Sequence, residues 1–163
     1  MTTRLALLAT LLAAACSGPP DIAGLYMTTE HRVSQTDCNA GEPASSSPPY
    51  FRIEEEELFG ATFYTRTNCE SEDPGTCTGG GGLLVEETDD GYRGTASFAL
   101  GEPPNCTLGY AVYEAAVDDD LLTFESRTYS ESGGEPCTTD EAEARGSDMP
   151  CAGYELIAGV LVE

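Results

Sequence analysis

The sequence predicts an all-β domain, an antiparallel meander of about eight strands curled into a closed or partly open barrel, with one short helix near residues 138–145. Apolar and polar residues alternate along several segments, as they do in strands with one buried face. Turn signals such as Asp90-Gly91 separate neighbouring segments. Sequential hairpins are most economically arranged as a meander that closes, because closure removes exposed edges. A β-sandwich is the alternative.

The candidate strands are residues 24–33, 50–54, 58–66, 83–88, 92–100, 107–117, 121–129 and 154–162. The segment 92–100 alternates most regularly: Tyr92, Phe98 and Leu100 fall on one side, and Arg93 and Ser97 on the other. We expect 83–88 to pair with 92–100, and 107–117 to pair with 121–129 through a loop at 118–120. Each pair would form an antiparallel hairpin.

The segments between the strands have the composition of surface loops. Residues 40–49 and 70–82 are rich in Gly, Pro, Ser and charge. The four glutamates at 54–57 are predicted to form a solvated turn. The glycine run at 79–82 lacks the G-K-[ST] of a phosphate loop, so we interpret it as a loop. The only histidine, His31, lies at a polar strand end and is predicted to be a surface residue.

The N-terminus has the pattern of an export signal. Residues 5–15 are an apolar run of eleven residues, whereas a helix needs roughly 20 to cross a bilayer. Ala13-Ala14-Ala15-Cys16 resembles the lipobox of bacterial lipoproteins, with Ala13 in place of the commoner leucine. The resemblance covers residues 1–20 and implies a signal peptide at 1–15, lipid attachment at Cys16 and a tether to residue 21. The remaining length predicts a single domain at 22–163. Ala13-x-Ala15 could instead be an ordinary cleavage site, which would give a soluble secreted protein.

Cysteine count supports the lipoprotein interpretation. The chain has seven cysteines, and removing Cys16 leaves an even set. In an oxidising compartment we expect this set to form three disulfides. These are Cys38, Cys69, Cys77, Cys106, Cys137 and Cys151. Six cysteines allow fifteen pairings, which the sequence cannot distinguish. The wide spacings and the single histidine disfavour a zinc site.

One pairing, Cys137 with Cys151, follows from a local argument. Between them, Thr138 and Glu141 form a capping box, Arg145 lies four residues after Glu141, and Gly146 can end the helix. A helix this short does not persist alone in water. A disulfide across its ends would supply the missing restraint.

The opening of the domain carries a second, smaller resemblance. Gly24-Leu25-Tyr26 looks like the first strand of lipocalin-like barrels, which have a Gly-x-aromatic there, although the aromatic here is not tryptophan. The resemblance implies a barrel shape and no ligand residues. A small apolar ligand could then lie inside, between side chains such as Tyr92, Phe98, Tyr110 and Phe124, where Gly94, Ala96, Gly109 and Ala111 would leave room.

Charge excludes several partners. From Cys16 onward the chain has 29 acidic residues, six arginines and no lysine, a formal charge of −23. Nucleic acid and anionic lipid would repel such a surface, so any membrane attachment must come from the lipid. The charge also favours a monomer.

No catalytic motif, cofactor motif or metal site emerges from the sequence, and we predict a protein that is not an enzyme. The acidic residues 118–120 do not match a calcium loop. Two function classes remain: a binding module, such as a lipocalin-like carrier of a small apolar ligand, and a structural or interaction protein with an envelope partner. Ser17, after the proposed lipid site, is not the aspartate associated with inner-membrane retention in lipoproteins, so the resemblance points to the outer membrane.

Overall fold

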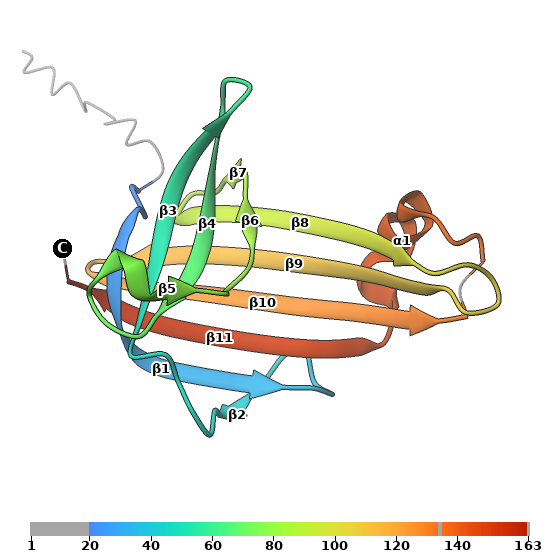
Figure 1. Ribbon diagram of the computed structural model, residues 1–163, viewed down its shortest axis with the longest axis horizontal. Coiled ribbons are helices and arrows are strands. Elements are labelled where there is room, and N and C mark those ends of the chain that lie inside the picture. Colours follow the sequence, from blue (N-terminus) through green and yellow to red (C-terminus); the bar gives the residue numbers. More distant parts are fainter. Residues whose placement is uncertain (1–19, 134, 163) are drawn as a thin grey trace, which may run out of the picture.

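The protein is an antiparallel β-structure with one short α-helix, as the sequence predicts. The computed structural model describes residues 20–133 and 135–162, so the predicted signal peptide and the predicted lipid site, Cys16, lie outside the described residues. The strands are β1 (Gly24–Ser34), β2 (Glu42–Pro43), β3 (Tyr50–Leu58), β4 (Ala61–Cys69), β5 (Cys77–Thr78), β6 (Leu83–Leu84), β7 (Glu86–Glu87), β8 (Gly91–Leu100), β9 (Thr107–Asp118), β10 (Leu121–Ser132) and β11 (Cys151–Leu161). The helices are α1 (Thr139–Arg145) and two 3₁₀ turns, η1 (Pro74–Thr76) and η2 (Gly146–Asp148) (Figure 1).

The long strands form a meander, because each except β4 pairs with the next long strand in the chain. Their order in the sheet is β4-β3-β1-β11-β10-β9-β8. The first and last long strands of the chain, β1 and β11, therefore lie side by side. Leu83–Leu84 pair with β4, whereas Glu86–Glu87 pair with β8. This one segment therefore bridges the two ends of the sheet. The result is a single sheet curled into a partly open half-barrel, and the sandwich alternative is wrong.

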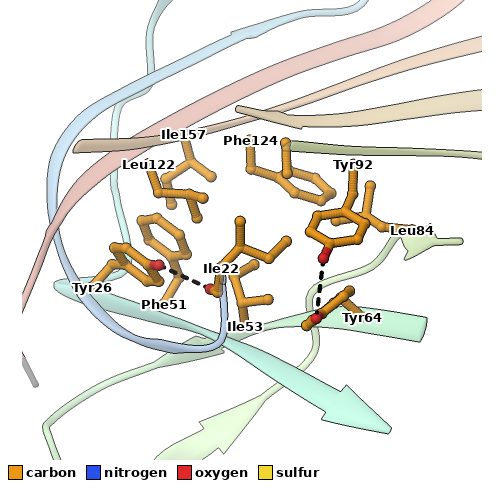
Figure 2. Close-up of a cluster of buried hydrophobic side chains, with 11 residues drawn as sticks. Ile22, Tyr26, Phe51, Ile53, Tyr64, Leu84, Tyr92, Leu122, Phe124 and Ile157 are labelled. Atoms are coloured by element: carbon orange, nitrogen blue, oxygen red, sulfur yellow. Dashed lines mark hydrogen bonds between the residues drawn. The ribbon is translucent and has the colours of Figure 1, made fainter. Parts of the chain in front are cut away.

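The main core fills one end of the half-barrel. It comprises Ile22, Tyr26, Phe51, Ile53, Tyr64, Leu84, Tyr92, Ala115, Leu122, Phe124 and Ile157 (Figure 2). Ile22, just before β1, is completely buried there. Tyr26 donates a hydrogen bond of 2.8 Å to the Ile22 carbonyl oxygen and stacks on Phe51. Burial, with a smaller effect of Asp21, raises the pKa of Tyr26 to about 12.

A second, smaller core lies on the opposite face of the sheet, under the helix. Cys106, Leu108, Ala142 and Met149 are buried there, and Tyr110 packs against them. On β9, residues 108 and 110 have the opposite parity to Ala115 of the main core, so they project to the other face. The expectation that Tyr110 lines the interior is therefore wrong. Tyr92 and Phe124 do lie inside.

Helix α1 begins as the sequence predicts. The Thr138 side chain accepts a hydrogen bond from the Glu141 amide, and Arg145 donates to the Glu141 carboxylate at 2.7 Å. Ala142 is completely buried, so packing against the sheet fixes the helix. The short helix therefore does not depend on a crosslink between its own two ends.

The six predicted cysteines form three disulfides, but the pairing of Cys137 with Cys151 is wrong. The bonds are Cys38–Cys151, Cys69–Cys77 and Cys106–Cys137. The helix packs on β8 and β9, which places Cys137 beside Cys106 at the start of β9. The chain then crosses to β11, where Cys151 meets Cys38 near the end of β1.

The four glutamates at 54–57 do not form a turn, contrary to expectation. They lie in β3, which pairs with β4 along its whole length. The turn follows at Phe59 and Gly60, so the next strand begins at Ala61, not at residue 58. Backbone pairing extends the hairpin beyond the point where its side chains are buried. Figure 1 shows this hairpin projecting beyond the rest of the sheet.

We predict that the Cys38–Cys151 bond stabilises the fold more than the Cys69–Cys77 bond. The two bonds join cysteines separated by 113 and 8 residues, and the chain-entropy model then gives a difference of about 2 kcal/mol. Urea denaturation of C38S/C151S and C69S/C77S should therefore show the larger loss in unfolding free energy for C38S/C151S. An equal or reversed order would contradict this ranking.

Candidate functional site

Three polar side chains from different strands meet on the inner face of the half-barrel: Arg66 of β4, Glu155 of β11 and His31 of β1. Strand register explains their meeting. Arg66 pairs with the buried Ile53, and His31 pairs with the buried Ile157. Glu155 lies two positions before Ile157 on the same strand, so it projects to the same face. These positions bring polar side chains into the interior, beside the apolar main core.

Arg66 and Glu155 form an ion pair across the interior. Nη2 of Arg66 donates to both Glu155 carboxylate oxygens, at 3.2 and 3.0 Å. The guanidinium carbon also lies 4.7 Å from the ring centroid of Phe124, a cation–π distance. Strands β4 and β11 are separated by β3 and β1 in the sheet. The contact therefore joins two walls of the half-barrel that share no backbone pairing.

The Arg66 guanidinium keeps hydrogen-bonding capacity that the described residues do not use. Arg66 is only 4% exposed, yet its Nε and Nη1 atoms have no hydrogen-bond partner among residues 20–133 and 135–162. Buried donors without an acceptor are costly, and most buried polar groups in proteins are paired. The site is thus suited to a molecule that brings oxygen acceptors.

A cleft of about 190 Å³ lies beside the ion pair, and we call it the Arg66 cleft. It is lined by Arg66, Gly80, Gly81, Tyr113, Phe124, Ser126, Thr128 and Glu155. A Cβ atom at Gly80 would lie 2.3 Å from the Arg66 carbonyl oxygen, so the glycine run passes closer to β4 than any side chain allows. Tyr113 also lines the cleft. Its hydroxyl is protonated at neutral pH, and burial raises its pKa still further above neutrality.

His31 is not the surface residue that the sequence predicts, because its side chain is only 10% exposed. Nε2 lies 3.1 Å from a Glu155 oxygen, and Nδ1 lies 3.2 Å from Oγ of Ser47. The loop before β3 covers the ring. A second cleft, of about 570 Å³, lies beside His31 and is lined by His31, Ser46, Ser47, Pro48, Pro49, Asn68, Cys69, Glu70 and Thr78.

The Ser47–His31–Glu155 chain has the residue types of a serine hydrolase relay, but its electrostatics differ. In such a relay the carboxylate stabilises the imidazolium that forms when histidine takes the serine proton. Here Arg66 already matches the charge of Glu155 through two hydrogen bonds. Little of that charge is left to stabilise an imidazolium. The chain is better suited to holding the loop of Ser47 against the sheet.

Sequence reasoning missed Arg66, Glu155 and Ser47, although a signal existed for two of them. Arg66 lies two residues after Tyr64, and Glu155 two residues before Ile157, so each shares a face with a buried residue. Strand alternation could have flagged both as charges facing inward. Ser47 lies in a loop, where no periodicity applies. Its contact with His31 depends on the tertiary fold.

We predict that removing Glu155 destabilises the fold more than removing Arg66. The side chain of Arg66 is 3% exposed, whereas that of Glu155 is 27% exposed. E155Q would leave a buried, unpaired guanidinium, a loss of about 3–5 kcal/mol, while R66M leaves a carboxylate that water can reach. Urea denaturation measures both. The interpretation fails if R66M proves the more damaging variant.

No family model, curated protein or solved structure in the comparisons matches this chain. Among the described residues, no three His, Cys, Asp or Glu side chains are grouped so as to hold a metal ion. No helix in residues 20–133 and 135–162 has the length and apolar character to span a membrane. Any assignment of function therefore has to come from the geometry of the site.

Proposed function

We propose that this protein is a lipid-anchored cell-envelope protein that acts as a non-enzymatic binding module, with the Arg66 cleft as its binding site. The observation that carries the binding proposal is the guanidinium of Arg66: the residue is 4% exposed and lines the cleft, and two of its donor nitrogens have no partner among the described residues. The ion pair of Arg66 with Glu155 supports binding over catalysis, because the charge of the carboxylate that contacts His31 is already matched by Arg66.

The disulfides support export, since such bonds persist in oxidising compartments. They use every cysteine of the chain except Cys16. Cys16 is the residue that the lipobox resemblance assigns to lipid attachment. We therefore propose Cys16 as the anchor and, from Ser17, the outer membrane as the location. Secretion after cleavage at Ala13-x-Ala15 is the alternative.

The ligand that best suits the cleft is small, uncharged and rich in hydroxyl groups. The unpartnered Arg66 nitrogens call for oxygen acceptors, the Glu155 carboxylate can accept, and the hydroxyls of Ser126 and Thr128 can accept or donate. The charges of Arg66 and Glu155 cancel, and the surrounding protein is strongly acidic, which disfavours an anion. The volume of about 190 Å³ is below the usual range for drug-sized ligands.

A small apolar ligand, the lipocalin-like alternative, has less support. The apolar part of the interior is occupied by the protein's own side chains, including Ile22 from the segment before β1 (Figure 2). Two of the small residues that might leave room are covered: the Phe98 ring lies against Gly109, and the Leu83 carbonyl oxygen against Gly94. The hollow that remains is polar.

The anchor is tested by the intact mass of the protein purified from its native cells. We expect a chain that begins at Cys16 and carries acyl chains, with a gain of six hydrogens on reduction of the three disulfides. The C16S variant is the control and should lack the acyl mass. A chain that begins at Cys16 without acyl chains would support secretion instead, and a start beyond Cys16 would overturn the anchor.

Binding is tested by NMR titration of the protein with D-glucose, D-galactose and N-acetylglucosamine. We expect at least one sugar to bind with a Kd of about 1 mM or tighter, worth about 4 kcal/mol. Shifts should be largest at the amides of Gly80, Gly81, Ser126 and Thr128. R66M should weaken binding about tenfold or more, because a hydrogen bond to a charged group is worth about 1.5–3 kcal/mol.

The matched control is R93M, which removes an arginine whose side chain is 46% exposed and which does not line the Arg66 cleft. It should leave sugar binding unchanged. Sodium acetate, an anionic probe, should bind more weakly than the sugars. Absence of shifts with all three sugars, or equal losses in R66M and R93M, would rule out the proposed ligand class.

A further inference from the structure

The tip of the β3–β4 hairpin exposes a large apolar group. Phe59 is 99% exposed and Leu58 beside it is 56% exposed. Figure 1 shows this tip at the far end of a hairpin that projects beyond the other strands. Single exposed apolar residues are common on protein surfaces. Phe59, however, is an aromatic residue at the end of a projecting hairpin, where no part of the chain that the structure describes covers it. Burial in the folded protein therefore cannot explain its presence there.

The backbone at this tip makes the choice of phenylalanine costly. Phe59 and Gly60 form the two-residue turn between the paired residues Leu58 and Ala61, with φ values of +54° and +80°. Such turns favour Asn or Asp followed by Gly, because the left-handed region disfavours bulky side chains. The β9–β10 turn places Asp119 at the same φ of +54°. Phe59 therefore gains neither burial nor a favourable conformation from its position.

The strand that leads to the tip is strongly acidic. Glu54, Glu55, Glu56 and Glu57 are all exposed, and no basic residue lies between Ile53 and Thr65. An apolar anchor with a charged surround is the usual anatomy of a binding hot spot, in which a buried aromatic residue supplies affinity and the rim supplies orientation. The hairpin thus combines both elements on one short segment.

We propose that the β3–β4 tip is a docking site for a protein partner that receives Phe59 in an apolar pocket bordered by lysine or arginine. The proposal is independent of the Arg66 cleft, since none of the residues at the tip lines it. Phe59 is the anchor and Leu58 extends the apolar contact. The four glutamates favour a partner whose pocket has a basic rim, and their attraction to that rim raises the rate of association.

Two other occupants fit the charges less well. An anionic lipid surface would repel the glutamates that must approach with Phe59. A second copy of this chain has few arginines to offer: five of the six from Cys16 onward, Arg32, Arg66, Arg93, Arg127 and Arg145, are already in ion pairs with glutamates of their own chain. A basic protein partner satisfies both the apolar and the acidic part of the tip.

The test is photo-crosslinking of the full-length protein in its native cells, with p-benzoylphenylalanine at position 59. The same probe at position 119, a matched turn position with the same φ, is the control. We expect a protein adduct from position 59 only. Its crosslinked peptide should lie in an apolar pocket bordered by Lys or Arg, and changing all four glutamates to glutamine should reduce its yield several-fold.

The identified partner is then purified and its affinity for the full-length protein is measured. F59N should abolish binding while the denaturation midpoint stays the same or rises, because asparagine tolerates this backbone conformation. That result separates a docking role from a structural one. Adducts with lipid or with a second copy, equal adducts from positions 59 and 119, or full binding by F59N would each overturn the proposal.

Discussion

The interior of this half-barrel is organised by one ion pair, that of Arg66 with Glu155. It joins strands β4 and β11, which have no backbone pairing with each other. A buried charge is tolerated only with a matched partner, so the pair fixes how far the two walls curl toward one another. It also divides the interior into an apolar end, filled by Ile22 and its neighbours, and a polar middle. The Arg66 cleft lies in that middle and owes its chemistry to the pair.

In a strongly acidic chain, ion pairs cannot neutralise most of the charge, so other interactions must stabilise the fold. Repulsion among the 29 acidic residues opposes a compact state, and most arginines are already paired with glutamates on the surface. Two of the disulfides offset this repulsion, because each crosslinks a segment that lies outside the long paired strands. Cys38–Cys151 fastens the segment after β1 to the start of β11, and Cys106–Cys137 fastens the chain before α1 to the sheet. Neither depends on pH or salt.

The strands were predictable because alternation is a local property, and Tyr92 to Leu100 carries it in nine adjacent residues. The predictions that were wrong concerned contacts between residues that are not neighbours in the sequence. The Cys137–Cys151 pairing assumed that a short helix needs a local clasp, whereas Ala142 and Met149 fix it to the sheet. The glutamates at 54–57 were assigned by their polarity, but backbone pairing with β4 keeps them in a strand. His31 and Ser47 meet through a fold that no local pattern contains, so the cleft beside them could not be predicted.

The proposed anchor would also constrain where the body lies. Only five residues lie between Cys16 and Ile22, and Ile22 is completely buried in the main core. A chain segment of this length spans at most about 20 Å, roughly two Debye lengths at physiological salt. If Cys16 carries acyl chains, the acidic body stays within reach of the lipid headgroups, and anionic headgroups would repel it. The same repulsion would favour orientations in which the acidic β3–β4 tip faces away from the bilayer, where a basic partner can approach it.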